Sequence, residues 1–314
     1  MPRGWVVVTG ANSGIGRACT RSLLAAGVPV IAACRDVERA ARDLAPLLVP
    51  QLDIVALDLG SLASVRAFAE TLAARRERQP LGGLICNAGV QIVGPPQRTV
   101  DGFERTFGVN HLGHYLLIHL LLPWLDAPAR IAVVASGTHD PAQRSGVPEP
   151  RWRGARELAE PDAAGLAAEG PMRTGLRAYS TSKLCNVLTT YAFAARLTVA
   201  ATTTIVAYDP GLTPGTGLAN QYPAPLGFLF ARFLPLLVPL LRRFQHVQSV
   251  DQAGHYLARL LTDPALTGVS GKYFAGPKEI QSSDASYDVA LQEELFVESA
   301  RLTGLGVPTA PRPC

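Results

Sequence analysis

Short apolar runs alternate with longer segments of mixed polarity along most of the chain. The first run, residues 5–9, is apolar except for its final threonine, which is typical of a strand buried on both faces of a sheet. In the longer segment 176–197, Leu, Val, Tyr and Phe recur at three- and four-residue spacing, the period of a helix. The whole pattern predicts strands at 5–9, 28–34, 52–57, 84–86, 131–135, 203–207 and 272–274, and helices at 17–26, 36–48, 61–76, 100–125, 176–197, 250–261 and 286–302.

This alternation of strand and helix predicts the fold class. Repeated β-α units with nearly continuous apolar strands form a parallel sheet covered by helices on both faces. We therefore expect an α/β protein, a single-domain Rossmann fold with a doubly wound parallel sheet of about seven strands. The chain has 314 residues, 48% hydrophobic and 17% charged, which is enough for one large core, and no linker divides residues 1–303.

Three stretches interrupt the alternation. Residues 140–176 are rich in Pro, Gly and Arg and predict a long substrate loop. Residues 212–247 contain an apolar run at 225–241 that an arginine and two prolines interrupt, so it falls short of the ~20 residues of a spanning helix. We interpret this region as a helical lid over the active-site mouth, with weak docking on a membrane surface as the alternative. The tail 304–314, with three prolines, is expected to be flexible.

Charge and cysteine content narrow the classes of partner and compartment. The net charge is +4, and no basic run is dense enough to predict nucleic-acid binding. The five cysteines are odd in number and lack a C-x-x-C spacing, so they predict neither a disulfide framework nor a zinc site. A reducing, cytoplasmic location is therefore expected.

A glycine-rich turn separates the first predicted strand from the first predicted helix. Gly10, Gly14 and Gly16 follow residues 5–9 directly, and the helix at 17–26 comes next. This order is the fingerprint of dinucleotide binding, because backbone amides at the helix N-terminus can approach a pyrophosphate. The spacing is G-x-x-x-G-x-G rather than G-x-G-x-x-G. A glycine cluster alone could be a plain turn, but the flanking elements favour the dinucleotide site.

Tyr179 and Lys183 lie four residues apart in the helix predicted at 176–197, a spacing that places both side chains on one face. A nearby ammonium lowers the pKa of a phenol. The pair could then give or take a proton near neutral pH, as carbonyl reduction or alcohol oxidation requires. An isolated pair of this kind is usually a surface pair, so its meaning depends on the rest of the chain.

Several motifs together resemble the short-chain dehydrogenase/reductase superfamily. In the superfamily's order and approximate spacing, over residues 5–275, they are Thr9-Gly-Ala-Asn-Ser-Gly-Ile-Gly16, Asp58, Asn87-Ala-Gly89, Asn110, Ser136, Tyr179-x-x-x-Lys183 and Pro210-Gly211. Within the superfamily the chain looks most like the retinol dehydrogenase and protochlorophyllide reductase branch. That similarity rests on Ala33-Cys-Arg-Asp36, Asn110-His-Leu-Gly-His114, Ser136 followed by His139, and Ser182-Lys-Leu-Cys-Asn186.

The resemblance implies a catalytic set of Asn110, Ser136, Tyr179 and Lys183. Tyr179 would be the general acid in reduction and the base in oxidation, and Ser136 would hydrogen-bond the substrate oxygen. Lys183 would lower the pKa of Tyr179 and hold the nicotinamide ribose, while Asn110 would help to hold a water that links Lys183 to solvent. Taken singly, Ser136 could cap a strand end and Asn110 could satisfy local backbone groups. Their joint occurrence favours the catalytic interpretation.

The resemblance also implies a bound NADP(H). A basic residue after the second strand accommodates the 2′-phosphate of NADP, whereas an acidic one binds the ribose of NAD. Arg35 and Asp36 are both candidates; we favour Arg35, helped by Arg39 and Ser13, with Asp36 capping the next helix. The implied cofactor contacts are Gly10, Asn12, Ser13, Gly14, Ile15, Gly16, Arg35, Arg39, Asp58, Leu59, Asn87, Ala88, Gly89, Tyr179, Lys183, Pro210, Gly211, Leu212 and Thr213. Whether Thr213 or Thr216 contacts the nicotinamide is left open.

Four histidines, at positions 111, 114, 119 and 139, raise the possibility of a metal site. No carboxylate pattern accompanies them, and a nicotinamide cofactor carries the hydride without a metal. We therefore expect packed or capping histidines.

The expected function is that of an NADPH-dependent reductase of ketones or aldehydes, reversible as an alcohol dehydrogenase. The apolar run 225–241 predicts a lipophilic or polycyclic substrate. Reduction of a carbon–carbon double bond is an alternative, although Leu212 occupies the place of a cysteine usual in protochlorophyllide reductases. A cofactor-sensing protein without catalysis is a further alternative. Relatives are often dimers or tetramers through the long helix and the Tyr179 helix, but this branch includes monomers, so the oligomeric state is left open, with a homodimer as one candidate.

Overall fold

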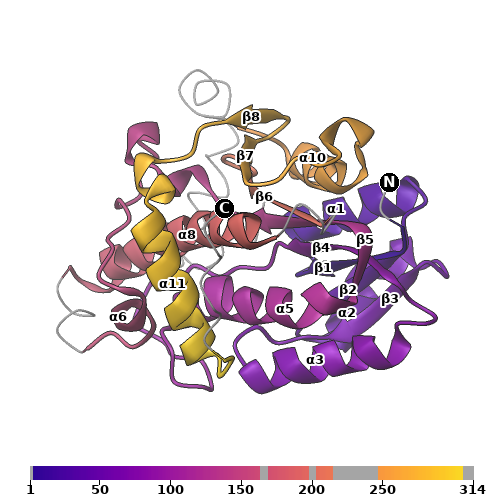
Figure 1. Cartoon of the computed structure of the whole chain (residues 1–314), viewed down its shortest axis with the longest axis horizontal. Helices are drawn as coiled ribbons and strands as arrows, with labels where there is room; N and C mark the ends of the chain where they lie inside the picture. Colours follow the sequence, from indigo (N-terminus) through magenta and orange to yellow (C-terminus); the bar gives the residue numbers. More distant parts are fainter. Residues whose placement is uncertain (1–2, 163–168, 198–202, 215–246, 307–314) are drawn as a thin grey trace.

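A single sheet of eight strands forms the centre of the molecule (Figure 1). The computed structural model describes residues 3–162, 169–197, 203–214 and 247–306. The strand order is β3-β2-β1-β4-β5-β6-β7-β8, and only β8 is antiparallel to its neighbour. The strands are β1 (Trp5–Thr9), β2 (Val30–Cys34), β3 (Leu52–Ala56), β4 (Leu81–Cys86), β5 (Leu125–Val134), β6 (Thr204–Asp209), β7 (Lys272–Ala275) and β8 (Lys278–Ile280). The predicted doubly wound α/β fold is confirmed.

Alternate residues of each central strand enter two separate cores, because successive side chains of a strand point to opposite faces. In β1, Val7 packs on one side, and Val6 and Val8 pack on the other. Helices α1 (Gly14–Ala25), α2 (Val37–Leu44) and α10 (Val250–Thr262) cover the face of Val6 and Val8. The opposite face is covered by α3 (Leu62–Arg75), α5 (Gly113–Leu121), α8 (Pro171–Arg196) and α11 (Val289–Leu302).

Polar side chains fix the starts of several helices. The Asp36 carboxylate accepts the Arg39 amide at 2.9 Å at the start of α2, as predicted, and Ser61 caps α3. Ser249 and Gln252 form a reciprocal capping box at the start of α10. Loss of a cap of this kind costs about 1 kcal/mol of stability. These local contacts explain why the starts of α2, α3 and α10 lie within one residue of the predicted positions.

The predicted strand number of about seven is too low by one. Strand β8 consists of three exposed residues, Lys278–Ile280, that pair with β7 across a tight turn. It carries no buried apolar residue, so the hydrophobic pattern gives no signal for it. Strand β5 also begins earlier than predicted, at Leu125 rather than 131.

The helix predicted over 100–125 is wrong in its first part. Residues 105–107 form the short helix α4, a π-helical turn follows at Gly108–Leu112, and α5 ends at Leu121. The Glu104 carboxylate accepts the amides of Thr106 and Phe107 and so starts the helix at this point. The π-helical turn, a feature often found at functional sites, contains Asn110.

The long loop predicted at 140–176 is shorter than expected. It contains a 3-10 turn at Pro141–Gln143 and the helix α6 (Ala155–Ala159), and α8 already begins at Pro171. The apolar run 225–241 and most of the proposed lid at 212–247 lie outside the described residues, as does the tail from residue 307. None of the described helices is long and apolar enough to cross a membrane.

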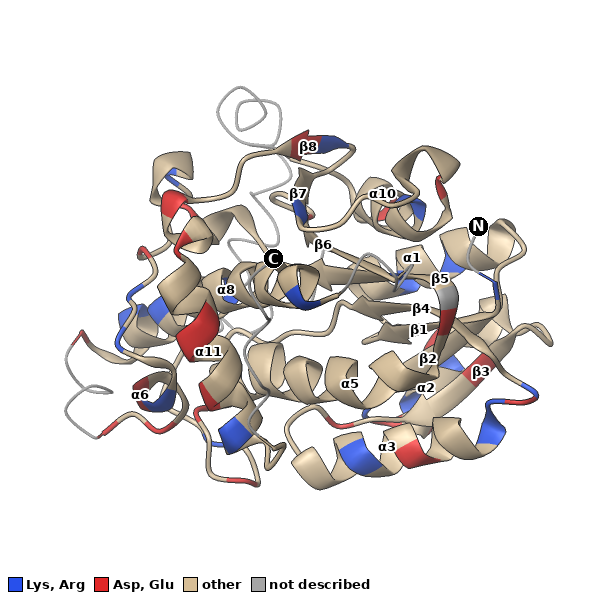
Figure 2. Ribbon diagram, in the orientation of Figure 1, with Lys and Arg blue, Asp and Glu red and all other residues tan. Residues whose placement is uncertain are grey.

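Charged side chains of both signs are spread over the described part of the chain. Figure 2 shows basic and acidic residues interspersed over the described helices and loops.

Cys19, Cys34, Cys86 and Cys185 are buried free thiols. Burial raises the pKa of the Cys34 thiol to about 11, so it remains protonated at neutral pH.

Candidate active site

The predicted site residues collect at one edge of the sheet. Gly10 follows β1, Asn87 follows β4, Ser136 lies just beyond β5 and Pro210 follows β6. These four strands are adjacent and parallel, so their carboxyl ends meet at the same edge. The strand order also reverses direction between β1 and β4, the place where open α/β sheets bind ligands.

Tyr179 and Lys183 lie together on α8, where their side chains are 8% and 4% exposed. The Lys183 Nζ lies 5.5 Å from the centroid of the Tyr179 ring. It donates a hydrogen bond of 3.0 Å to the carbonyl oxygen of Val134, which also accepts from Asn186 at 3.0 Å. The Tyr179–Lys183 pair was predicted to share one helical face. It is held through Lys183 at the end of β5, two residues before Ser136.

Burial lowers the pKa of Lys183 from 10.5 to about 8, and the nearby Asp209 carboxylate opposes this effect. Removal of an ammonium from water disfavours its charged form. At pH 7 the amine is still mostly protonated, so the site holds a buried positive charge beside Tyr179.

Asn110 joins the π-helical turn to the loop after β4. Its Oδ1 accepts the amide of Val90 at 2.7 Å, and its Nδ2 donates to the Val90 carbonyl and to Ser182 Oγ at 2.9 and 3.0 Å. A Cβ placed on Gly89 would lie 3.3 Å from Asn110 Oδ1 and 3.7 Å from Lys183 Nζ. Asn110, Gly89 and Lys183 thus border the same small region. The bonds to Val90 show that Asn110 also satisfies backbone groups.

Ser136 begins the 3-10 turn Gly137–His139. Its Oγ accepts the Thr138 amide at a long 3.3 Å, so the hydroxyl hydrogen remains available for a substrate oxygen. Its carbonyl oxygen accepts from His139 Nδ1 at 2.7 Å. The backbone on both sides of the serine is therefore held in place.

The glycine turn has the geometry of a dinucleotide cradle. Gly10 has a φ of +66°, and a Cβ on Gly16 would lie 2.2 Å from the Gly10 carbonyl oxygen. Ser13 precedes α1 but its side chain makes no capping hydrogen bond. The amides of the first helical turn have no intrahelical acceptor, so they are left for an anionic group. These features fit a bound pyrophosphate.

The residues predicted to bind the adenosine part of the cofactor follow β2 and β3. Arg35 and Arg39 are exposed beyond the end of β2, and Arg39 lies 3.5 Å from the Asp43 carboxylate. Asp58 accepts the Gly60 amide at 2.9 Å, which fixes its carboxylate after β3. The side chain of Leu59 is buried in the core, so only its backbone can face a ligand.

The loop after β6 is also ordered by side chains. Gly211 has a φ of +68°, and its amide donates to Asp209 Oδ1 at 2.8 Å. Thr213 is buried and donates to the Pro210 carbonyl at 3.1 Å. Leu212 forms an isolated parallel β-bridge with Val247. Thr216 lies outside the described residues, so the choice between the two threonines stays open.

Sequence reasoning missed the part that Thr9 and His114 play. Thr9 Oγ1 accepts the amides of Asn87 and Ala88, each at 2.9 Å, and lies 2.9 Å from His114 Nε2. His114 Nδ1 contacts the carbonyl oxygen of Asn110 at 3.1 Å, so this nitrogen must be the donor. Burial lowers the pKa of His114 to about 4 and keeps the ring neutral. The two residues connect the π-helical turn to the ends of β1 and β4.

His111 and His119, which were also considered as metal ligands, pack against other side chains. His111 lies 2.8 Å from Ser299 Oγ, and His119 packs against Phe193 and Phe296. Among the described residues, no group of three His, Cys, Asp or Glu side chains could hold a metal ion.

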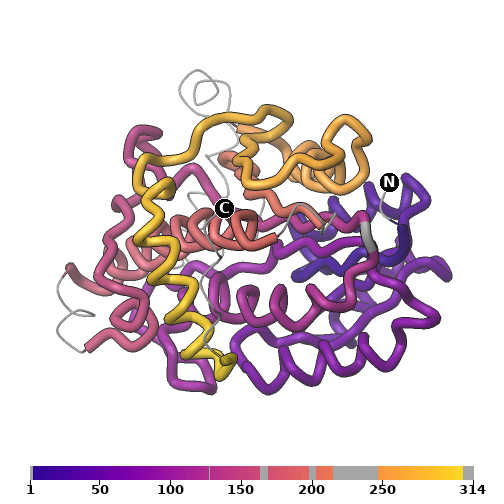
Figure 3. Tube along the Cα trace, viewed as in Figure 1, coloured from indigo at the N-terminus to yellow at the C-terminus, as the bar shows by residue number. Residues whose placement is uncertain are grey.

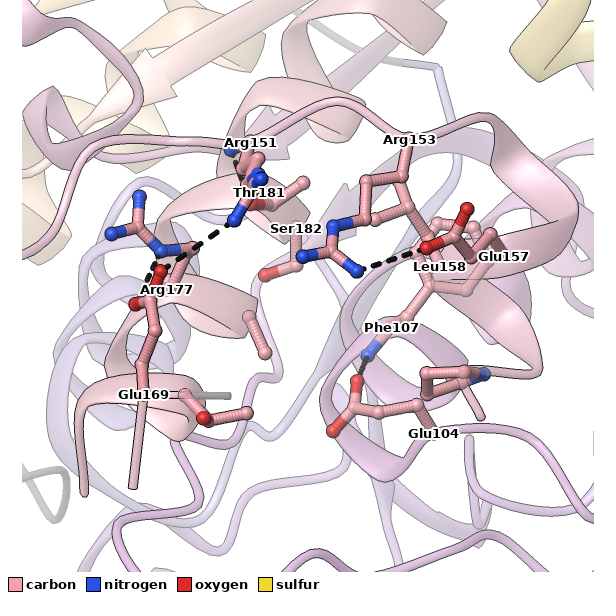
Figure 4. Close-up of a pocket in the computed structure, with 13 residues that line it drawn as sticks. Glu104, Phe107, Arg151, Arg153, Glu157, Leu158, Glu169, Arg177, Thr181 and Ser182 are labelled. Atoms are coloured by element: carbon pink, nitrogen blue, oxygen red, sulfur yellow. Dashed lines mark hydrogen bonds and ion pairs between the residues drawn. The ribbon is translucent and has the colours of Figure 1, made fainter. Parts of the chain in front are cut away.

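The cavity drawn in Figure 4 lies beside this site, and the two share only the neighbourhood of Ser182, which accepts from Asn110. Its volume is about 90 Å³, and its lining residues Thr174 and Thr181 lie seven apart on the face of α8 turned away from Tyr179 and Lys183. Its arginines are paired with carboxylates, Arg153 with Glu157 at 3.0 Å and Arg177 with Glu169 at 2.8 Å (Figure 4). We assign no ligand to it.

Comparison with known proteins decides the family. A family model described as short chain dehydrogenase matches residues 4–145. The chloroplastic protochlorophyllide reductase of Daucus carota is 35% identical over 322 residues, which covers 96% of this chain and 79% of that protein. The chain belongs to the short-chain dehydrogenase/reductase superfamily. Retinol dehydrogenase 13 of Mus musculus is 36% identical over 318 residues, 98% of this chain and 86% of that protein, so the expected branch is confirmed as well.

Solved structures share this fold. A crystal structure of an uncharacterized protein from Mycobacterium Paratuberculosis superimposes with a TM-score of 0.69 at 28% identity, covering 98% of this chain and 96% of the other. A carbonyl reductase from chicken fatty liver, crystallised with bound NADPH, has a TM-score of 0.60 at 22% identity, with 90% of this chain and all of the other covered. The latter similarity concerns the fold of this short-chain dehydrogenase/reductase and leaves its substrate open.

Proposed function

We propose that this short-chain dehydrogenase/reductase is an NADPH-dependent oxidoreductase that interconverts a carbonyl and an alcohol group on a lipophilic or polycyclic substrate. The observation that carries the proposal is the buried contact between Tyr179 and Lys183 at the end of β5, beside Asn110 and Ser136. A Tyr–Lys pair with only a structural role would not need a buried ammonium, because burial of an ammonium without an ion-pair partner is unfavourable.

Each of the four catalytic residues has a definable task. Tyr179 gives its hydroxyl proton to the substrate oxygen in reduction and takes it back in oxidation. Ser136 donates a hydrogen bond to the same oxygen and orients it. The Lys183 ammonium favours the phenolate that Tyr179 becomes when it has lost its proton. Asn110 holds the loop after β4 against the π-helical turn, so that Gly89 and Lys183 keep their places.

The residues of the glycine turn and the strand ends fit a nicotinamide dinucleotide, which supplies the hydride when it is bound. The amides of the first turn of α1 would hold the pyrophosphate, and Arg35 with Arg39 would bind a 2′-phosphate. Asp58 would hold the adenine, and the loop from Pro210 to Thr213 would border the nicotinamide. Two exposed arginines after β2, with Asp36 engaged as a helix cap, favour NADPH over NADH.

Reduction of a carbon–carbon double bond is the second candidate. It is favoured by the 35% identity to proteins named protochlorophyllide reductase. Leu212 counts against it, because this position would carry a cysteine in that group. A cofactor sensor without catalysis is disfavoured by the complete set of Ser136, Tyr179 and Lys183.

The proposal is tested by following NADPH oxidation, with NADH in parallel, across a panel of aliphatic, aromatic and polycyclic carbonyl compounds. Tyr179→Phe removes only the hydroxyl and is the matched variant. We expect turnover with NADPH that falls by roughly 100-fold or more in the variant, because general acid catalysis contributes about 10²–10⁴-fold.

Two other outcomes would change the assignment. Turnover that Tyr179→Phe leaves intact would refute the tyrosine as proton donor. Tight NADPH binding without turnover on the carbonyl panel would direct the next assay to enones and pigments, and a lack of turnover there as well would favour the sensor.

A further inference from the structure

His139 is a buried histidine beside the candidate active site to which the proposed reaction gives no task. It ends the 3-10 turn that begins after Ser136 and is 1% exposed. Its ring lies against Tyr273 with centroids 5.0 Å apart. Both of its ring nitrogens have backbone partners, one in the catalytic loop and one in the segment after β8.

The two partners fix the tautomer of the ring. The amide of Ser283 lies 3.1 Å from Nε2 and can only donate, so Nε2 carries no hydrogen. The carbonyl oxygen of Ser136 lies 2.7 Å from Nδ1 and can only accept, so Nδ1 carries the hydrogen. The ring is therefore a neutral bridge from Ser283 to Ser136. Protonation of Nε2 would point its hydrogen at the amide hydrogen of Ser283.

The surroundings support a neutral ring. Burial lowers the pKa of His139, while the bond to the Ser136 carbonyl and the carboxylates of Asp209 and Asp140 oppose the effect. The loop is closely packed at Gly137, where a Cβ would lie 2.2 Å from Gln143 Oε1 and 3.0 Å from Asp209 Oδ2. A backbone held this closely can set the direction of the Ser136 hydroxyl.

We propose that His139 is a positioning residue for Ser136. Its Nδ1–H tautomer ties the catalytic loop after β5 to the segment that follows β8, and so holds the Ser136 hydroxyl where it meets the substrate oxygen. The proposal rests on the proposed function, because it assumes that Ser136 orients a reacting oxygen. Misplacement of a catalytic group by about 1 Å can cost roughly 100-fold in rate.

Two substitutions separate the two hydrogen bonds. In His139→Asn the amide nitrogen takes the place of Nδ1 and can still donate to the Ser136 carbonyl. In His139→Gln the amide oxygen takes the place of Nε2 and can still accept from Ser283, but the side-chain bond to the Ser136 carbonyl is lost, and that carbonyl keeps only the backbone amide of residue 139 at 3.1 Å. With the best carbonyl substrate from the panel, we expect kcat to fall roughly 10- to 100-fold in His139→Gln and to recover most of this loss in His139→Asn. The KM for NADPH should not change in either variant.

A matched control accounts for the general cost of replacing a buried histidine. His119 is packed between Tyr115, Phe193 and Phe296, away from the catalytic residues. His119→Gln should lower thermal stability and leave kcat unchanged. Equal losses of kcat in His139→Asn and His139→Gln, or no loss in either, would overturn the proposal.

The tautomer can be measured without any substrate, so a failure of the proposed function is distinguishable from a failure of this inference. The ¹⁵N chemical shifts of His139, assigned by comparison with the spectrum of His139→Asn, should show a protonated Nδ1 and an unprotonated Nε2 in the wild-type protein at pH 7. A protonated Nε2 would contradict the bridge to Ser136 even if the enzyme is active.

Discussion

At the scale of single residues, Lys183 shows how the fold changes the chemistry of a side chain. The amine is buried, its pKa falls to about 8, and its hydrogen-bond acceptor is a neutral backbone carbonyl. Asp209 opposes the shift but makes no ion pair within 4 Å of it among the described residues. A buried charge with this environment lowers the stability of the folded state and is retained where the chemistry needs it.

The first prediction concerns stability and pH. Below about pH 8 the folded chain carries a buried charge that the unfolded chain keeps in water, whereas above pH 10.5 the amine is neutral in both states. Measured without added cofactor, the free energy of unfolding of the wild type should therefore rise between these values relative to Lys183→Met. At pH 7 Lys183→Met should be inactive but about 1–3 kcal/mol more stable, since the Val134 carbonyl keeps its bond to Asn186.

Chemical denaturation at a series of pH values measures this difference. Lys278→Met, which removes an exposed lysine of β8, is the control and should follow the wild type throughout. A Lys183→Met variant that is less stable than the wild type at pH 7 would show that the ammonium stabilises the fold.

The second prediction concerns cofactor choice, which depends on exposed residues after β2. If Arg35 binds the 2′-phosphate, Arg35→Ala should raise the KM for NADPH roughly 10- to 100-fold, because a charge-assisted hydrogen bond contributes about 1.5–3 kcal/mol. The KM for NADH should hardly change. Arg78→Ala, at an exposed turn before β4, is the matched control. An equal effect on both cofactors would refute the selectivity assignment.

At the scale of elements, the position of the glycine turn depends on a close contact between two helices. Helix α10 meets α1, the helix that the turn opens, where a Cβ on Gly254 would lie 2.4 Å from the Ala18 Cβ and 2.6 Å from the Cys19 amide nitrogen. Both helices cover the same face of the sheet as Val6 and Val8. The contact fixes how far α1 stands from α10 and so where its first turn lies.

The third prediction follows from this contact. Gly254→Ala should lower the free energy of unfolding by about 1–3 kcal/mol through overpacking, although alanine is favoured over glycine in a helix by about 1 kcal/mol. It should also weaken NADPH binding, because α1 must shift. Calorimetry and a fluorescence titration measure the two effects. Gly306→Ala, where no atom lies within 4 Å of the added Cβ, should be neutral.

At the scale of the whole molecule, α11 covers part of α5 and α8, the helices through which the family resemblance led us to consider a homodimer. It crosses α8 and α5 on the outside of the sheet (Figures 1 and 3). Tyr115 donates to the Phe296 carbonyl at 2.7 Å, Arg196 pairs with Glu293, and the Arg196 guanidinium lies 3.8 Å from the centre of the Phe296 ring. A second copy that paired through this part of α5 and α8 would have to displace α11.

The fourth prediction is that this surface does not support a homodimer. Light scattering at micromolar concentration should give the mass of one chain, with the same result after addition of NADPH. A doubled mass, together with protection of α5 and α8 from hydrogen exchange on association, would show that α11 moves away.

The order of most elements and the choice of candidate catalytic residues follow from the sequence alone. Apolar runs such as Val6-Val7-Val8 predict strands because short runs of β-branched residues favour a strand that is buried on both faces. Asp36 and Ser61 specify helix starts through contacts within four residues. Tyr179 and Lys183 share a face because of the helical period. All of these are relations between residues close together in the chain, so they can be predicted from the sequence without the fold.

The tertiary structure decided what depends on distant parts of the chain. Strand β8 pairs through its backbone and leaves no hydrophobic signal, and the π-helical turn at Asn110 is held by a bond to Val90. The low pKa of Lys183 comes from burial by several elements, and the tautomer of His139 is set by Ser283, 144 positions along the chain. Burial and long-range hydrogen bonds exist only when the elements have packed together. The sequence therefore determined which groups could react, and only the folded structure determined their surroundings.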